Sequence, residues 1–245
     1  MSTEDRTYNE ACADVYDQWF GSCEEAAIDR LAELAGSGRV LELGIGSGLI
    51  ALPLAARGIE LHGIDLSPAM VAKLRAKPGG EAIPVMMGSF ADVAVEGEFS
   101  LIFVAYNSFF ALQTQDEQVL CFQNVAAHLA EGGTFVLEAF VPQSANFTGG
   151  LKVTAVTDER IGLKVSEHDP VRQRLKSQHI VIRNGEVRLY PVEVRYAWPA
   201  ELDLMAQIAG LRLRHRWSNW ERNEIRADSA RHISVYEKTG AQPTG

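Results

Sequence analysis

Three glycines at alternate positions are the feature of the 245-residue sequence with the clearest chemical meaning. They follow the apolar run Val40–Leu43 and are Gly44, Gly46 and Gly48. Because glycine has no Cβ, the backbone of such a turn can bend sharply and lie directly against a ligand. A second apolar run, Leu61–Asp65, ends on a carboxylate, which can accept hydrogen bonds from the hydroxyls of a ribose. Together the two features predict a nucleotide-binding pocket.

The spacing of the glycines indicates which nucleotide is bound. Dinucleotide-binding folds use G-x-G-x-x-G and direct a helix N-terminus at a pyrophosphate, whereas this turn has the spacing G-x-G-x-G. It resembles motif I of the class I S-adenosylmethionine-dependent methyltransferases, whose strand usually opens with an acidic residue, here Glu42. The resemblance implies S-adenosylmethionine as the cofactor, with Asp65 as the ribose ligand. An NAD-dependent oxidoreductase is disfavoured by the glycine spacing and by the lack of a convincing Tyr-x-x-x-Lys pair.

Two later strand ends fit the same resemblance. Residues 87–90 occupy the place where the family often has Gly-Asp followed by an apolar residue. Ser89 stands at the aspartate position and could bond the adenine amino group, while Phe90 could flank the ring. The fourth expected strand, residues 99–105, leads into Tyr106, and in the family this strand end contacts the methionine portion of the cofactor and opens toward the acceptor.

The following segment is predicted as a helix and a returning strand. Apolar periodicity indicates an amphipathic helix over residues 115–130 and a fifth strand over residues 134–140. Residues 129–133 between them resemble the family's turn before its fifth strand.

The N-terminal segment is similar to that of small-molecule methyltransferases over residues 13–20. There a tyrosine from a covering helix closes over the cofactor, which points to Tyr16, with Tyr8 and Trp19 behind it. All three rings could instead pack the helix onto the domain, since aromatic side chains bury large areas whatever their function. The cofactor contacts expected from the resemblance are Tyr8, Tyr16, Gly44, Ile45, Gly46, Gly48, Asp65, Leu66, Met70, Gly88, Ser89, Phe90, Ala105 and Tyr106.

Methyl transfer places modest demands on side chains, because the sulfonium is already activated and the acceptor must chiefly be held in line with the methyl carbon. A base matters only for a nucleophile that carries a proton. Glu138 ends an apolar strand at the ligand-binding edge, where it could pair with an amine, accept a proton or simply face solvent. The expected catalytic residues are Tyr16, Tyr106, Glu138 and His179, and the expected substrate contacts are Trp19, Asn107, Phe109, Phe140 and Trp198.

Composition narrows the possible partners. The formal net charge of -9 argues against nucleic acid, and no apolar run approaches the roughly 18 to 20 residues that cross a bilayer. The start of the chain lacks the basic and apolar regions of a signal peptide, so a cytoplasmic location is expected. Neither the three cysteines nor the six histidines show metal-ligand spacing, which predicts no catalytic metal.

These elements predict one α/β domain over residues 1–245, with a Rossmann-like, seven-stranded, mostly parallel sheet flanked by helices. The expected parts are an N-terminal helical cover (1–36), a cofactor-binding core (37–141), an antiparallel β insertion (149–198) and a C-terminal helix with two strands (199–239). Within the insertion, Asn184-Gly185 marks a two-residue hairpin. Such insertions resemble those of bacterial amino-sugar N-methyltransferases, where they cover the acceptor site or form a dimer contact.

The predicted function is methylation of a small molecule in secondary metabolism by a monomer or homodimer. An amine or amino-sugar nitrogen is favoured as the acceptor. Carbon or oxygen methylation of an aromatic natural-product intermediate such as an indole or phenol stays open, as does a non-catalytic adenosylmethionine-binding role, because a cofactor motif reports binding and leaves turnover undetermined.

Overall fold

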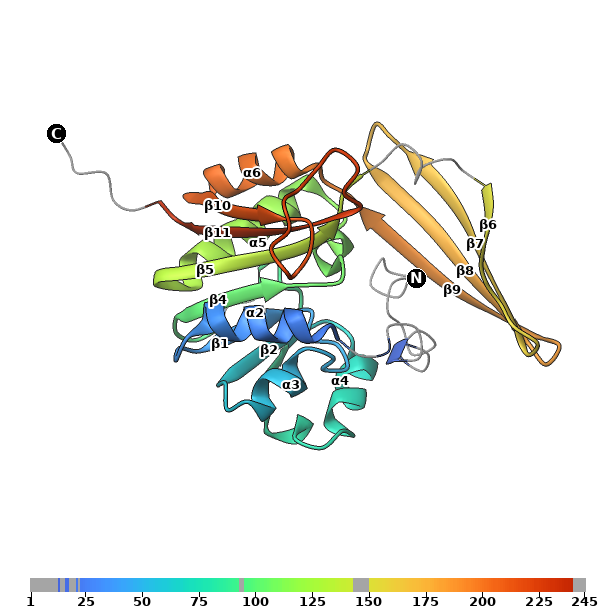
Figure 1. The fold of residues 1–245 in the computed structure, drawn as a ribbon, viewed down its shortest axis with the longest axis horizontal. Coiled ribbons are helices and arrows are strands. Elements are labelled where there is room, and N and C mark those ends of the chain that lie inside the picture. Colours follow the sequence, from blue (N-terminus) through green and yellow to red (C-terminus); the bar gives the residue numbers. More distant parts are fainter. Residues whose placement is uncertain are drawn as a thin grey trace.

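Two β-sheets organise the computed structural model, which describes residues 13, 16, 17, 21, 23–92, 95–142 and 150–239. The larger sheet has seven strands in the order β10-β11-β5-β4-β1-β2-β3, and the smaller has four in the order β6-β7-β8-β9. In Figure 1 the four-stranded sheet stands beyond one edge of the seven-stranded sheet. The prediction of a Rossmann-like core with an antiparallel insertion is confirmed.

The seven-stranded sheet is parallel through β1, β2, β3, β4 and β5, and β11 alone runs against the other strands, because it pairs antiparallel with both β5 and β10. Its strands are β1 (Val40–Leu43), β2 (Leu61–Asp65), β3 (Val85–Met87), β4 (Phe99–Val104), β5 (Leu129–Phe140), β10 (Leu211–Trp217) and β11 (Arg231–Lys238). β1 is buried at every position, as a strand covered on both faces must be. All parallel strands therefore present their carboxyl ends at one edge, where ligands bind in open α/β sheets.

Helices cover both faces of this sheet. They are α2 (Glu25–Ala35), α3 (Ala51–Ala56), α4 (Pro68–Arg75), α5 (Gln115–His128) and α6 (Pro199–Ile208), with short 3₁₀ turns η2 (Gly80–Ala82) and η3 (Ser108–Ala111). α5 and α6 contribute to one apolar core cluster, whereas α2 and α3 contribute to the cluster on the opposite face. α5 begins with a capping box, since Thr114 accepts from the Glu117 amide and the Glu117 carboxylate accepts in return.

Strand β5 begins earlier than the sequence suggests. Residues 129–133 are expected as a turn, but Leu129 already pairs with Phe99, and Thr134 pairs with Leu101. The extra residues form an irregularity in the ladder that includes Gly132 at φ 74°. A bulge lets the chain leave α5 and enter the sheet without a separate loop.

The smaller sheet is an antiparallel meander of β6 (Gly150–Val156), β7 (Arg160–Asp169), β8 (Arg174–Arg183) and β9 (Glu186–Arg195). Asn184 and Gly185 connect the last two strands with φ values of 52° and 80°, as a two-residue hairpin of the predicted kind requires. One face of this sheet is turned toward the edge where β4 and β5 end (Figure 1).

Among the residues that the structure describes, none of the helices has the length and apolarity to cross a membrane. The same part of the chain contains no group of three or more histidine, cysteine and acidic side chains that could hold a metal ion.

Candidate cofactor and acceptor site

The glycine turn lies directly after β1 and is packed so closely that side chains are excluded. Gly46 and Gly48 have φ values of 56° and 81°. A Cβ on Gly48 would lie 2.5 Å from Leu74 Cδ1, and one on Gly46 would lie 3.1 Å from Met70 Cε. Gly48 is therefore favoured both by backbone conformation and by lack of space, and Gly46 chiefly by its backbone conformation.

Asp65 ends β2 beside this turn. Its Oδ2 accepts from the Gly46 amide at 2.7 Å, and its Oδ1 accepts from the Ser67 amide at 2.8 Å. Burial raises the pKa of Asp65, and these backbone donors oppose that effect. Each carboxylate oxygen has a second acceptor position, so the residue can hold the turn and still accept hydrogen bonds from a diol.

Glu42 is a buried acid in the middle of β1, and its Oε2 has no hydrogen-bond partner within the described residues. Desolvation, followed by repulsion from Asp65, raises the pKa of Glu42 well above its usual value. A buried oxygen without a partner costs free energy unless a ligand satisfies it. Two carboxylates beside an uncharged glycine turn fit a ligand with hydroxyl and ammonium donors, as S-adenosylmethionine has.

The residues that the resemblance assigns to adenine binding lie at the same edge of the sheet as the glycine turn and Asp65. The Gly88 amide donates to the Asp65 carbonyl at 2.9 Å, and Phe90 Cε1 would lie 3.7 Å from a Cβ on Gly44. Ser89 Oγ accepts from the Ala91 amide at 3.2 Å. Of the other expected contacts, Ile45, Met70 and Ala105 are buried, and Leu66 is exposed.

The N-terminal candidates meet the glycine turn through two residues. Tyr16 is buried against Met70, and Asp17 Oδ1 accepts from Ser47 Oγ at 2.5 Å. Asp17 Oδ2 also pairs with Lys77 Nζ at 2.7 Å. Tyr8 and Trp19 lie outside the described residues. The N-terminal segment therefore contacts the glycine turn at Asp17, and Tyr16 packs beside that turn on Met70 of α4.

At the end of β4, two consecutive residues adopt the left-handed conformation: Tyr106 at φ 52° and Asn107 at φ 65°. Such backbone is unfavourable for bulky residues such as tyrosine, and strained residues of this kind cluster at functional sites. Both residues are held by the neighbouring strand β5. Glu138 Oε2 accepts from the Tyr106 amide at 3.2 Å, and Asn107 Oδ1 accepts from the Phe140 amide at 2.6 Å.

Glu138 is the centre of a buried polar cluster. Arg231 donates to Glu138 Oε1 at 3.2 Å and to Glu24 Oε2 at 3.0 Å. Burial raises the pKa of Glu138, while the Tyr106 amide and Arg231 lower it. The Tyr106 hydroxyl shares a hydrogen bond with Cys23, and burial raises the pKa of that hydroxyl, so it stays protonated.

The remaining candidates occupy different surroundings. Phe109 is fully buried against Phe122, with ring centroids 5.5 Å apart, and Phe140 contacts Phe110 at 5.0 Å. Trp198 is 46% exposed at the start of α6. His179 lies on β8 beside Lys164 and Tyr190, and burial together with Lys164 lowers its pKa.

Sequence reasoning missed Arg231, Lys77 and Asp17 as members of the site. Arg231 could have been found from the antiparallel return of the last strand, which places its first residue opposite Phe140 at the carboxyl edge of β5. No local pattern marks the contacts among Asp17, Ser47 and Lys77, since they join residues at least 30 positions apart.

Comparison with known proteins decides the family. A model of the methyltransferase domain matches residues 40–133. The CcbJ methyltransferase of Streptomyces caelestis is 40% identical, with a TM-score of 0.90 over 96% of this chain and 99% of that chain. The chain belongs to the S-adenosylmethionine-dependent methyltransferases.

Two further comparisons concern one relative in sequence and one solved structure with the same fold. The cypemycin N-terminal methyltransferase of a Streptomyces species is 28% identical over 70% of this chain and 71% of its own length. CalS10, an amino pentose methyltransferase of Micromonospora echinaspora solved with S-adenosylmethionine, has a TM-score of 0.71 over 92% of this chain and 97% of that chain, at 22% identity. The methyltransferase uses S-adenosylmethionine as methyl donor, as predicted, and methylates a small molecule.

Proposed function

We propose that this methyltransferase methylates the nitrogen of an amine, with an amino sugar or a related natural-product amine as the substrate class. The observation that supports it most is the buried Glu138 beside the left-handed Tyr106 at the end of β4. A carboxylate held at the acceptor edge attracts an ammonium group more strongly than a neutral hydroxyl. The name of the 28% identical relative, an N-terminal methyltransferase, supports the same choice.

The glycine turn and its two acids would hold the donor. Asp65 would accept from the ribose hydroxyls, and Glu42 Oε2 would accept from the ammonium of the methionine portion. Gly46 and Gly48 would let the backbone lie against the ligand, and Tyr16 would close the N-terminal side. When bound, S-adenosylmethionine supplies a methyl group on a positively charged sulfur, which is an activated donor.

Glu138 and Tyr106 would place the acceptor. The nitrogen of an amine can attack the methyl carbon only when it is unprotonated. At neutral pH most amines carry a proton, which must first be removed. Glu138, whose pKa is raised by burial, can accept a proton near the site, and the Tyr106 hydroxyl can orient the nitrogen by hydrogen bonding. The nitrogen lone pair forms the new bond to carbon, the carbon–sulfur electrons stay on sulfur, and the product ammonium releases its proton to solvent.

Matched pairs of acceptors test the proposal. The purified enzyme would be incubated with S-adenosylmethionine and either a 2-amino sugar or the same sugar with a hydroxyl at that position. A peptide with a free N-terminus, its acetylated form and a simple phenol complete the set. We expect mass spectrometry to find an added methyl group only on the free amines. Methylation of the phenol or hydroxyl partner, with none on the amines, would contradict N-methylation and favour the oxygen or carbon alternative.

A binding control distinguishes a wrong acceptor proposal from a purified protein that has lost the ability to bind its cofactor. Calorimetric titration with S-adenosylmethionine should give binding by the wild type even if no acceptor in the set is methylated. The cytoplasmic location and the roles assigned to individual residues stay predictions.

A further inference from the structure

Arg231, the first residue of β11, contacts the acceptor side of the site but has no part in the function proposed above. It pairs with Phe140 of β5, so its side chain lies on the same face of the sheet as Glu138, two positions earlier on that strand. Arg231 Nη1 lies 3.2 Å from Glu138 Oε1, and Nη2 lies 3.0 Å from Glu24 Oε2. One guanidinium therefore joins an acid of the acceptor site to an acid that precedes α2.

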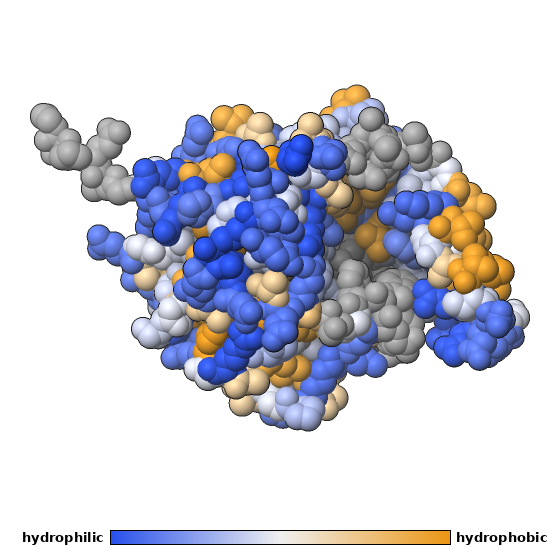
Figure 2. All heavy atoms as spheres, viewed as in Figure 1, coloured by the Kyte–Doolittle hydropathy of each residue, from blue (hydrophilic) through white to orange (hydrophobic). Residues whose placement is uncertain are grey.

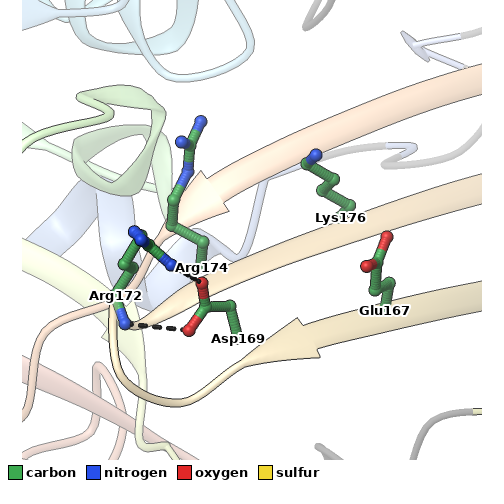
Figure 3. Close-up of a pocket in the computed structure, with 5 residues that line it drawn as sticks. All are labelled: Glu167, Asp169, Arg172, Arg174 and Lys176. Carbon is green, nitrogen blue, oxygen red and sulfur yellow. Dashed lines mark hydrogen bonds and ion pairs between the residues drawn. The ribbon is translucent and has the colours of Figure 1, made fainter.

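The burial of Glu138 distinguishes this contact from the ion pairs at the protein surface. Hydrophilic residues cover much of the face that the seven-stranded core presents in Figure 2. At the cavity in Figure 3, Arg172 pairs with Asp169 at 3.0 Å, and the two side chains are 73% and 38% exposed, so water screens their attraction. The side chain of Glu138 is only 7% exposed. Arg231 therefore acts on a carboxyl group from which water is largely excluded.

The effect of Arg231 opposes that of burial. Burial raises the pKa of Glu138, whereas the Tyr106 amide, Arg231 and Trp220 lower it. Glu138 can attract an ammonium group or accept a proton only as a carboxylate. The arginine thus favours the form of Glu138 that an amine acceptor needs.

The other titratable groups around this pair do not replace the arginine. Glu24 raises the pKa of Glu138 by charge repulsion, and Glu221 acts on Arg231 itself. Cys23 and the Tyr106 hydroxyl share a hydrogen bond, and burial raises the pKa of both groups, so both stay neutral. Arg231 is therefore the cation, among the described residues that act on Glu138, that compensates its charge.

We propose that Arg231 is a positioning residue for methyl transfer, which keeps Glu138 ionised and holds its Oε1 in place while an amine acceptor binds. Glu138 Oε2 accepts from the Tyr106 amide and Oε1 from Arg231, so both oxygens are fixed. Each oxygen has a second lone pair that can accept from the acceptor. This role depends on the N-methylation proposed above, since a neutral phenol or hydroxyl would not need a charged partner to hold it.

Glu24 fixes the guanidinium from the other side. Its Oε1 and Oε2 accept from Arg231 Nη1 and Nη2 at 2.5 and 3.0 Å, which is a two-point contact between a planar fork and a carboxylate. Glu24 directly precedes α2, and its neighbour Cys23 shares the hydrogen bond with the Tyr106 hydroxyl. The two residues before α2 therefore orient both groups that face Glu138 from this side.

The pH dependence of kcat/KM for an amine acceptor tests the role of Arg231. In Arg231→Met the carboxyl of Glu138 should keep its proton up to a higher pH. We expect the acid limb of the profile to move upward by about one pH unit, because a nearby opposite charge lowers the pKa of a carboxyl by about that much or more. Activity should recover at higher pH. The acceptor amine has its own titration, but this is the same for every variant and cancels in the comparison.

Two further variants give the expected direction of each effect. Arg231→Lys keeps the positive charge and should recover most of the shift, although an ammonium lacks the planar fork that pairs with both acids. Glu24→Gln removes a charge that raises the pKa of Glu138, so the acid limb should move to lower pH. Opposite shifts from two neighbouring residues are not expected if the cluster only stabilises the fold.

The matched control is Arg212→Met on β10 of the same sheet. Arg212 pairs with Glu237 at 2.7 Å, but its side chain is 64% exposed and has no contact with the site. The control loses the same charge as Arg231→Met and should keep the wild-type acid limb. Circular dichroism verifies that each variant is folded.

A direct titration of Glu138 needs no acceptor. In protein labelled with carbon-13 at the glutamate carboxyl groups, the Glu138 signal is assigned by its loss in Glu138→Gln and followed by NMR as the pH changes. Its midpoint should rise by about one pH unit in Arg231→Met and fall in Glu24→Gln. Because no methylation is measured, this result stays valid even if the acceptor proves to be a phenol or hydroxyl.

An unchanged Glu138 midpoint in folded Arg231→Met would overturn the role of Arg231 whatever the acceptor is. A fall in kcat/KM by the same factor at every pH would overturn it too, since that result indicates a purely structural contact. A shifted midpoint together with a shifted acid limb, recovered in Arg231→Lys and absent in Arg212→Met, would support it. Methylation of hydroxyl acceptors alone would contradict N-methylation and would leave the measured midpoints unaffected.

Discussion

The Tyr106 amide donates a hydrogen bond to Glu138 Oε2 at 3.2 Å, and through this contact strand β5 stabilises a left-handed residue at the end of β4. Asn107 makes the reciprocal contact, since its side chain accepts from the Phe140 amide. The acceptor side of the site is thus a strained turn held by the adjacent strand. Strain of this kind costs about 1 to 3 kcal/mol per residue and persists only where surrounding contacts require it.

Glu138→Ala removes the acceptor for the Tyr106 amide and one of the two acidic partners of Arg231. We expect a loss of about 1 to 3 kcal/mol in the free energy of unfolding and a fall in kcat, because a buried donor loses its partner and the turn relaxes. Glu138→Gln keeps an acceptor oxygen and should recover part of both losses. Thermal unfolding and steady-state kinetics measure the two effects.

The control is Glu131→Gln, which changes an exposed glutamate at the other end of the same strand. It should behave as the wild type. Wild-type kinetics in Glu138→Ala would show that the cluster has no part in turnover.

Asp65→Ala should weaken S-adenosylmethionine binding by about 1.5 to 3 kcal/mol, as loss of a charge-assisted hydrogen bond predicts. The carboxylate also accepts from the Gly46 amide, so Asp65→Asn, which keeps one acceptor, should fall between the wild type and the alanine variant. Titration calorimetry gives both affinities, with circular dichroism to verify folding. Unchanged affinity in a folded Asp65→Ala protein would remove Asp65 from the cofactor site.

Asp17 and Lys77 should act together in cofactor retention. Asp17→Ala and Lys77→Ala each break the 2.7 Å ion pair, and the aspartate change also removes the Ser47 contact. Because both side chains are partly exposed, we expect a coupling free energy of only about 0.2 to 1 kcal/mol. A double-mutant cycle on the S-adenosylmethionine Kd measures it. If the effects of the two substitutions on the binding free energy were strictly additive, the ion pair would not link the N-terminal segment to the glycine turn.

His232 should make the fold sensitive to acid. Burial, aided by Arg216, lowers the pKa of His232 to about 3, whereas the unfolded chain titrates near 6.5. Between these values the unfolded state binds a proton that the folded state does not. The stability that neutral His232 contributes is therefore complete only about one pH unit above 6.5, and it is lost as the pH falls toward 3. Between pH 6.5 and 4.5 the loss is about 2 kcal/mol.

His232→Leu removes the titrating group and should flatten the acid side of the stability curve. Urea unfolding of both proteins across this range gives the difference. Burial raises the pKa of Asp65 and Glu138, so these acids act in the opposite direction and appear equally in both curves. Parallel curves would show that His232 binds a proton as readily in the folded state as in the unfolded state.

The sequence by itself determined those features whose cause is local. The glycine turn, the carboxylate that ends β2 and the Asn184-Gly185 hairpin each depend on backbone requirements within a few residues, and such requirements leave readable patterns. They were enough to predict the sheet, the cofactor and the insertion. The start of β5 was misplaced because its bulge depends on pairing with β4.

Only the tertiary structure decided the features that join distant residues. Arg231 reaches Glu138 across 93 positions, and Asp17 pairs with Lys77 where both contact Ser47 of the glycine turn. The two faces of the four-stranded sheet likewise required the register of its strands, since alternation identifies two faces but leaves open which one the protein covers. These contacts are set by how strands and helices pack in space, and no spacing along the chain encodes that arrangement directly.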